Sequence, residues 1–113
     1  MDEQEQVVIN LIVNSGSARS SAIEAIQYAK AGDIKKAEES LQTAKETVND
    51  AHHSQTELIQ AEIRGEKSPL NLLMAHAQDH LMTALVVIDL AQEFIDVYKK
   101  IGELIKNFLL MNS

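Results

Sequence analysis

The residues of this chain with the clearest chemical potential stand together in the stretch HAQDH, which spans residues 76–80. His76 and His80 are four positions apart, so a helix places both imidazoles on one face, one turn from each other. Such a pair can bind zinc, although the intervening Ala-Gln-Asp lacks the glutamate of a zinc-protease helix. A neutral imidazole is also a competent nucleophile, because free histidine titrates near ~6.5. As a bare pattern, two helical histidines are more often partly exposed surface residues than ligands.

Composition narrows this chemistry. The chain has 113 residues and no Cys, which excludes thiolate nucleophiles, iron–sulfur clusters and disulfides and fits a reducing compartment. Lys and Arg number 10 against 17 Asp and Glu, so a phosphate backbone would repel the chain and nucleic acid is not an expected partner. The N-terminus is acidic, unlike a signal peptide, and the longest uncharged stretches (68–78 and 80–88) are shorter than a membrane span of ~18 residues. We expect a cytoplasmic protein without membrane insertion.

Three long helices are predicted to position these side chains. Gly32-Asp33 and Gly65 to Ser68-Pro69 each combine a helix stop with an N-cap, and Gly102 indicates a third break. Helix-favouring residues dominate the segments between these breaks, and only four aromatic residues argue against a β-fold. The predicted helices span about 4–31, 33–64 and 69–101, and a short apolar tail follows at 103–113. Short connections favour one all-α domain, an antiparallel three-helix bundle covering residues 1–113.

The third segment carries more apolar surface than one core needs. On a helical wheel, one arc suffices to face the first two helices: Met74, Ala77, Leu81, Ala84, Leu85 and Ile88. A second arc lies on another side: Leu72, Ala75, Asp79, Met82 and Val86. A helix that is apolar on two sides is buried on two sides. We therefore expect self-association through the second arc, and a dimer or a threefold arrangement would suit it equally.

Asp79 interrupts this second arc at a core-type position. One interpretation is a polar residue that fixes register and oligomer state. The other is that symmetry gathers several carboxylates, which must be protonated or neutralised by a cation to lie so close. Oxygen-only ligands favour Mg²⁺ or Ca²⁺ over zinc. The spacing by itself favours neither interpretation.

The stretch LLMAHAQDHLMTA at 72–84 resembles the signature of the lactose/cellobiose-specific IIA components of the bacterial phosphoenolpyruvate-dependent sugar phosphotransferase system. Similar blocks occur in the family's order: GSARS at 16–20, Glu24-Ala25, Gly32-Asp33 and AHHSQTELI at 51–59. The resemblance covers roughly residues 7–100. Ala75 departs from the family pattern, where Val is expected before the histidine, and this changes packing rather than chemistry.

The resemblance implies a homotrimer of three-helix subunits that carries a phosphoryl group on a histidine. The donor is the phosphocarrier protein HPr, and the acceptor is a cysteine of the cognate IIB component. It assigns the phosphorylated nucleophile to His76 and places Asp79 at the trimer axis, with one Mg²⁺ per trimer. His80 is then expected to stabilise the phosphoryl group. Gln78 points about 160° away from His76, so any phosphoryl group that it touches should be on a neighbouring subunit.

The implied system takes up and phosphorylates a β-linked disaccharide of the cellobiose, chitobiose and lactose class. Two other classes of function compete with this hypothesis. A non-catalytic trimeric helical adaptor explains the apolar arcs but gives no reason for His76 and His80, and a zinc hydrolase lacks a third ligand and a general base. His52 and His53, in the second segment, are expected to make one interhelical contact and one solvated surface position.

Overall fold

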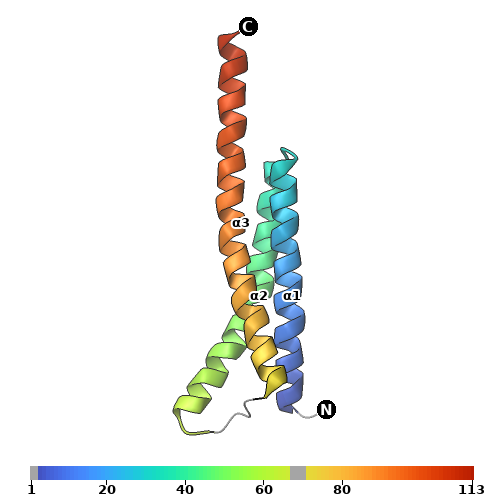
Figure 1. Ribbon diagram of the computed structural model, residues 1–113, viewed down its shortest axis with the longest axis vertical. Helices are drawn as coiled ribbons and strands as arrows, with labels where there is room; N and C mark the ends of the chain where they lie inside the picture. The colour runs from blue at the N-terminus through green and yellow to red at the C-terminus, as the bar shows by residue number, and fades with distance from the viewer. Residues whose placement is uncertain (1–2, 67–70) are drawn as a thin grey trace.

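The computed structural model describes residues 3–66 and 71–113. These residues form three α-helices: α1 (Glu3–Lys30), α2 (Ile34–Ile63) and α3 (Leu72–Met111). α2 runs antiparallel to α1 and α3, and α3 continues well beyond the turn that joins α1 to α2 (Figure 1). The molecule is correspondingly long, 68 × 25 × 20 Å. The predicted all-α three-helix architecture is confirmed for the described part of the chain.

Both predicted glycine stops are present. Gly32 and Gly65 have φ of 89° and 90°, a conformation that a residue without a Cβ adopts at little cost. After α1, the Asp33 N–H donates to the Tyr28 carbonyl at 2.9 Å. The Asp33 side chain then accepts the Lys36 N–H at 3.1 Å and caps α2 as predicted.

α3 begins later than the sequence predicts. The proposed start at Ser68-Pro69 lies outside the described residues, but Asn71 is extended (φ −131°, ψ 174°), so the helix begins at Leu72 rather than at 69. The Asn71 side chain accepts the Met74 N–H at 2.8 Å. Asn caps a helix as well as Ser does. Here the Asn71 side chain and carbonyl accept hydrogen bonds from N–H groups of the first turn of α3.

α3 also ends later than the sequence predicts. The expected break at Gly102 is wrong, because α3 runs through this glycine to Met111. One glycine inside a helix costs about 1 kcal/mol relative to alanine. Most of the residues on either side are good helix formers, and they outweigh that cost. The predicted tail at 103–113 is therefore mostly a continuation of α3.

Alanine dominates the buried core. The buried apolar residues are Val8, Leu11, Ala18, Ala22, Ala25 and Ala29 of α1, Ala37, Leu41, Ala44, Val48 and Ala51 of α2, and Met74, Ala77, Leu81, Ala84, Ile88, Ala91 and Ile95 of α3. Such small side chains let helix backbones approach closely. Ser15 is buried in the same seam of α1, and its hydroxyl has no hydrogen-bond partner in the described structure. The first predicted arc of α3 is thus its inner face, whereas members of the second arc such as Leu72 and Met82 are exposed.

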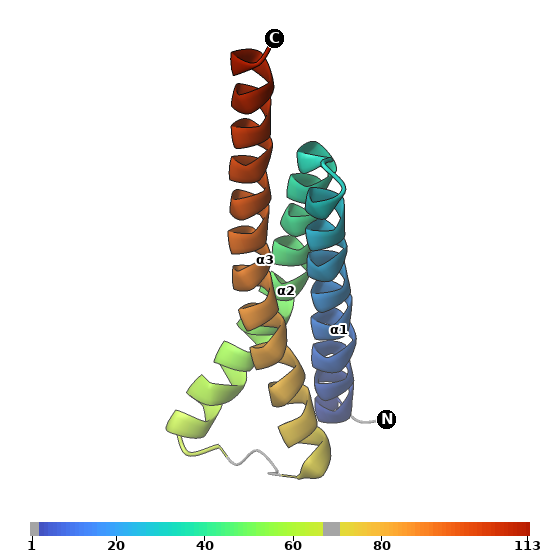
Figure 2. The same cartoon turned by 45° about the horizontal axis from the view of Figure 1, so that its top comes forward.

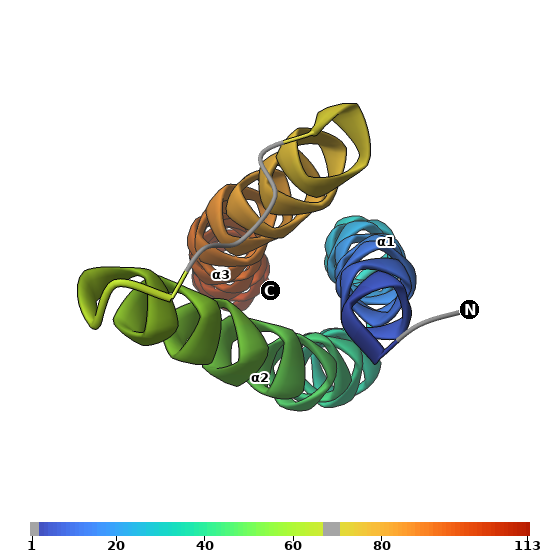
Figure 3. The same ribbon diagram turned by 90° about the horizontal axis from the view of Figure 1, so that it is seen from below.

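α1 lies along both other helices, but α2 and α3 separate at one end. Figures 2 and 3 show the C-terminal part of α2 diverging from the N-terminal part of α3. None of the described helices is long and apolar enough to cross a membrane. The divergence leaves the first turns of α3, which carry the HAQDH stretch, at an open end of the bundle.

Candidate functional site

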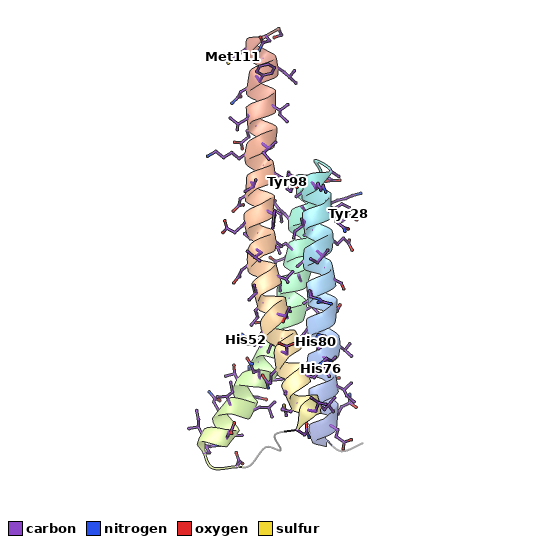
Figure 4. All side chains as sticks on the ribbon, in the orientation of Figure 1. Tyr28, His52, His76, His80, Tyr98 and Met111 are labelled. Atoms are coloured by element: carbon purple, nitrogen blue, oxygen red, sulfur yellow. The ribbon has the colours of Figure 1, made fainter. Side chains whose placement is uncertain are left out.

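His76 and His80 are in direct contact near the start of α3 (Figure 4). Their Nε2 atoms are 3.0 Å apart, a hydrogen-bond distance. The two rings meet edge to face, with centroids 4.4 Å apart and an interplanar angle of 89°. His76 is exposed and His80 is half-buried. The helical spacing therefore produces the expected pair, with the more accessible imidazole on the residue predicted to be the nucleophile.

His76 is closer to the helix N-terminus than the sequence predicts. Because α3 begins at Leu72, His76 is its fifth residue rather than one about two turns inside the helix. The Ala75 N–H already donates to the Asn71 carbonyl at 3.0 Å. The helix dipole acts mainly within the first turn, which His76 just follows. Side-chain donors must still supply most of the stabilisation of any anion at His76.

Two exposed leucines lie beside the His76 imidazole. Leu72, Leu73 and His76 line a surface hollow of about 490 Å³. Leu72 is 87% exposed and Leu73 is 42% exposed in the single chain. Exposed leucines beside an accessible imidazole are typical of a surface that docks another protein.

Gln78 lies away from the histidine pair, as the wheel predicts. Its Oε1 accepts the side-chain N–H of Gln55, on α2, at 2.6 Å. Gln78 is half-buried and makes a long contact of 3.7 Å from its Nε2 to the Met74 sulfur. Sequence reasoning did not identify Gln55 as its partner, although a glutamine at an apolar seam position of α2 was an available signal. Within one chain, the pair joins α2 to α3 and does not reach His76.

Asp79 is exposed on the outer side of α3. Its carboxylate has no hydrogen bond or ion pair within residues 3–66 and 71–113. No group of three histidine or acidic side chains that could hold a metal occurs in the part of one chain that the structure describes. Any metal bound through Asp79 would therefore need carboxylates from several copies.

The second histidine pair is not an interhelical contact. His52 and His53 are both exposed on α2, and His53 bonds to Glu57 one turn along the same helix. The expectation that one of them packs between helices is wrong, because both point away from the alanine seam through Ala51. His52 thus offers a surface histidine unrelated to the His76–His80 pair.

The arrangement is suited to covalent group transfer by an imidazole. With the hydrogen on His80, the His76 Nε2 is the acceptor and presents a lone pair. A group attached at that atom would lie within reach of the His80 N–H. One residue can therefore act as nucleophile while the other donates to the transferred group.

Known proteins are similar to this chain in sequence and in fold. The family described as "PTS system, Lactose/Cellobiose specific IIA subunit" matches residues 6–99. The lichenan-specific phosphotransferase enzyme IIA component of Bacillus subtilis is 53% identical over 102 residues, covering 90% of this chain and 93% of that protein. The N,N'-diacetylchitobiose-specific EIIA component of Escherichia coli is 40% identical over 100 residues, covering 88% of this chain and 86% of that protein.

Solved structures agree with these matches. The crystal structure of the cellobiose-specific enzyme IIA from Bacillus anthracis superposes with a TM-score of 0.87 at 55% identity, covering 91% of this chain and 94% of that one. The Escherichia coli IIA(chitobiose) solved in complex with HPr gives a TM-score of 0.77 at 38% identity, covering 90% of this chain and 99% of that one. The chain therefore belongs to the lactose/cellobiose-specific IIA subunits of the sugar phosphotransferase system.

Proposed function

We propose that this chain is a phosphocarrier that accepts a phosphoryl group from phospho-HPr on His76 and passes it to a cysteine of its IIB component. The observation that carries the proposal is the exposed His76 imidazole, whose Nε2 lies 3.0 Å from that of His80, in a member of the IIA family. As a phosphotransferase component, the protein is itself the covalent intermediate.

Each half of the cycle exchanges one bond for another. A phosphorus–nitrogen bond forms at His76 as the bond from phosphorus to the donor breaks, and later that bond breaks as a phosphorus–sulfur bond forms on IIB. The transition state is loose, with charge spread over three equatorial oxygens, so the protein mainly positions donors. His80 supports this role because its N–H is free to donate to a phosphoryl oxygen once His76 Nε2 is phosphorylated.

The proposal includes a homotrimer with a metal at its axis. Asp79 is an exposed carboxylate on the outer side of α3, among exposed apolar side chains, and it has no hydrogen-bond or ion-pair partner in the described part of the chain. Three copies around an axis would repel one another unless a cation or protons intervened. An all-oxygen set suits Mg²⁺, so we assign one Mg²⁺ per trimer to the Asp79 carboxylates.

In that trimer, Gln78 is proposed to act on a neighbouring subunit. It lies on the opposite side of α3 from its own His76, and its bond to Gln55 fixes the amide between α2 and α3. Because the Gln78 side chain is already held in place, it loses little conformational entropy when it donates to a phosphoryl group across an interface. His76 and His80 would then come from one subunit, and Gln78 from the next.

The names of the relatives support a substrate class and partners for this chain. Those relatives are named for lichenan, cellobiose, diacetylchitobiose and lactose, and one structural relative was solved with HPr. We propose that this chain serves uptake of a β-linked disaccharide of that class. It would work in the cytoplasm, exchanging phosphoryl groups with HPr and IIB.

The test is phosphorylation by phosphoenolpyruvate, enzyme I and HPr, followed by intact-protein mass spectrometry. We expect one acid-labile phosphoryl group per chain, full loss in His76→Ala and partial retention in His80→Ala. His52→Ala is the matched control, because it removes an exposed histidine outside the pair and should phosphorylate normally. Phosphorylation of His76→Ala would contradict the assignment. Stable trimers that never gain a phosphoryl group would instead favour the adaptor function.

A further inference from the structure

The last turns of α3 project from the bundle. Tyr98 is the last α3 side chain that packs against the core, and residues 101–113 are all exposed. Figures 1 and 4 show this end of α3, up to Met111, projecting past the α1–α2 turn. The family match ends at residue 99, so the role of this segment has to be inferred from its own residues.

The tip of α3, residues 108–111, presents apolar side chains on every side of the helix. The four residues are Phe108, Leu109, Leu110 and Met111, which are 65%, 61%, 64% and 85% exposed. Successive side chains of a helix are about 100° apart. Self-association of α3 through its outer arc would therefore cover Phe108 and Met111, but it would leave Leu109 and Leu110 in water. A partner packed on one side cannot cover the whole tip, whereas lipid can surround it.

The charge of α3 reverses where the helix leaves the bundle. Residues 72–97 include four acidic side chains and no Lys or Arg, whereas residues 98–111 include three lysines and one glutamate. The α1–α2 turn lies toward the same end of the molecule (Figure 1). Residues 29–39, in and beside this turn, add three more lysines and three acidic residues. This end thus has a small excess of positive charge in a chain whose net charge is −7, so an anionic surface attracts it more than the rest of the molecule.

Side chains beyond the helix cap its last turn. Asn112 Nδ2 donates to the Phe108 carbonyl at 2.8 Å, and Ser113 Oγ donates to the Leu110 carbonyl at 3.0 Å. The last carbonyls of a helix lack partners within the helix, and an unpaired carbonyl is costly where water is scarce. These two hydrogen bonds lower the cost of placing the end of α3 in the interfacial layer of a bilayer.

We propose that the tip of α3 docks on the surface of a membrane that contains anionic lipids. Its apolar side chains would enter the boundary between headgroups and acyl chains. Lys100 and Lys106 would extend their ammonium groups to the lipid phosphates. No part of the chain would cross the bilayer. The inference depends neither on phosphotransfer nor on the homotrimer, although an assembly that presents several tips at one end would bind more tightly.

Docking through the tip would leave the histidine pair far from the lipid. Phe108 is 32 residues from His76 in one continuous helix, which corresponds to about 48 Å. The carrier would be concentrated at the membrane, where sugar uptake takes place, with His76 still open to soluble partners. An acidic partner protein is a poorer occupant of the tip, because it would have to surround the helix end on every side.

Flotation with lipid vesicles tests the docking. The wild-type chain should float with phosphatidylcholine–phosphatidylglycerol vesicles and much less with pure phosphatidylcholine, and added salt should release it. Leu110→Glu should lower the partition coefficient by about 10-fold or more, because it places a charge at the tip. Lys106→Gln should lower it by about fivefold on the anionic vesicles.

Val13→Glu is the matched control for flotation, since Val13 is 60% exposed, close to the 64% of Leu110, but lies on α1. It should bind vesicles as the wild type does. Three results would each overturn the inference: no binding of the wild type to anionic vesicles, equal binding of Leu110→Glu and the wild type, or equal binding to the two kinds of vesicle.

Tryptophan fluorescence tests whether the tip enters the lipid, because the chain has no tryptophan of its own. The emission of Leu110→Trp should shift to shorter wavelengths on anionic vesicles and be quenched by brominated lipids, whereas that of Val13→Trp should do neither. Equal responses of the two variants would contradict docking through the tip.

Sedimentation equilibrium separates lipid from a second copy of the chain as the occupant. Leu110→Glu should leave self-association unchanged, and weaker association together with no vesicle binding of the wild type would assign the tip to contacts between copies. Phosphorylation by HPr without vesicles is read separately and should be normal in Leu110→Glu. A wild-type chain that binds vesicles but is never phosphorylated would refute only the proposed function.

Discussion

The two faces of α3 are both apolar, yet only one of them is buried in the folded chain. Ala77, Leu81 and Ile95 on the inner face are fully buried, whereas Met82, Leu90 and Val97 on the outer face are about half exposed, at 52%, 50% and 52%. α1 and α2 cover only the inner face. The comparison shows that apolar spacing determines which residues share a face, and that a partner must exist before the face is buried.

The first prediction tests the inner face and carries the largest expected effect. Leu81→Ala should lower the free energy of unfolding by about 2–5 kcal/mol, because it removes a fully buried side chain and leaves a cavity. Urea denaturation measures this. Leu110→Ala, on the exposed end of α3, should change it by less than about 0.5 kcal/mol. Equal losses in the two variants would contradict the distinction between the faces.

The second prediction tests what covers the outer face. Asp79→Leu should eliminate the axial metal that we propose, measured by elemental analysis of the purified protein. It should also make thermal unfolding insensitive to a chelator. In metal-free buffer the variant should be more stable than the wild type by about 1–4 kcal/mol. The reason is that leucines replace the Asp79 carboxylates, which would repel one another in the proposed trimer.

Asp50→Leu is the control for that experiment, because it removes an exposed carboxylate from α2 rather than from the outer arc. It should retain the metal and the chelator sensitivity. Unchanged metal content in Asp79→Leu would show that the ligand assignment is wrong.

The third prediction concerns the border between the two faces, where Gln78 meets Gln55. A double-mutant cycle of Gln55→Ala and Gln78→Ala should give a coupling energy of about 1 kcal/mol in chemical denaturation. Phosphorylation by HPr should slow more in Gln78→Ala than in Gln55→Ala, because only Gln78 is proposed to touch the phosphoryl group. The reverse order would remove Gln78 from the site.

The fourth prediction carries the smallest expected effect and concerns the ion pair between Lys99 of α3 and Glu38 of α2, near the last α3 residues that pack against the other helices. Lys99 Nζ donates to Glu38 Oε1 of α2 at 2.8 Å, and this hydrogen bond, with the Glu38 charge, raises the pKa of Lys99 above its usual 10.5. Because the pKa of Lys99 is higher in the folded state than in the unfolded state, the protonated ammonium stabilises the fold. This contribution is complete below pH 10.5, and it is lost as the pH rises through the folded-state pKa of Lys99.

Lys99→Met should therefore lower Tm slightly at pH 8 and not at a pH well above 10.5. The pair is at the surface, with side chains 46% and 52% exposed, so salt should weaken the difference. A Tm difference that grows with pH would contradict the sign.

Much of the fold was predictable because it depends on local chemistry. Gly32 and Gly65 adopt positive φ, and Asp33 caps α2, as the residue types indicate. The third helix was harder to delimit. Gly102 carries a helix penalty that its neighbours outweigh, and Asn71 caps the helix after the expected start.

The histidine pair was predictable for the same local reason, since an i, i+4 spacing brings His76 and His80 together. The bond between Gln55 and Gln78 was not, because their contact depends on how α2 is placed against α3. The outward orientation of His52 and His53 likewise depended on the packing of α2.

The sequence alone determined the helices, their apolar faces, the pairing of the two histidines and the resemblance to the IIA family, because all of these follow from residue type and spacing along one chain. Only the tertiary structure decided which face of α3 is covered and which side chain holds Gln78. Those features depend on contacts between helices, and such contacts are fixed by the packing of the whole bundle rather than by any one segment.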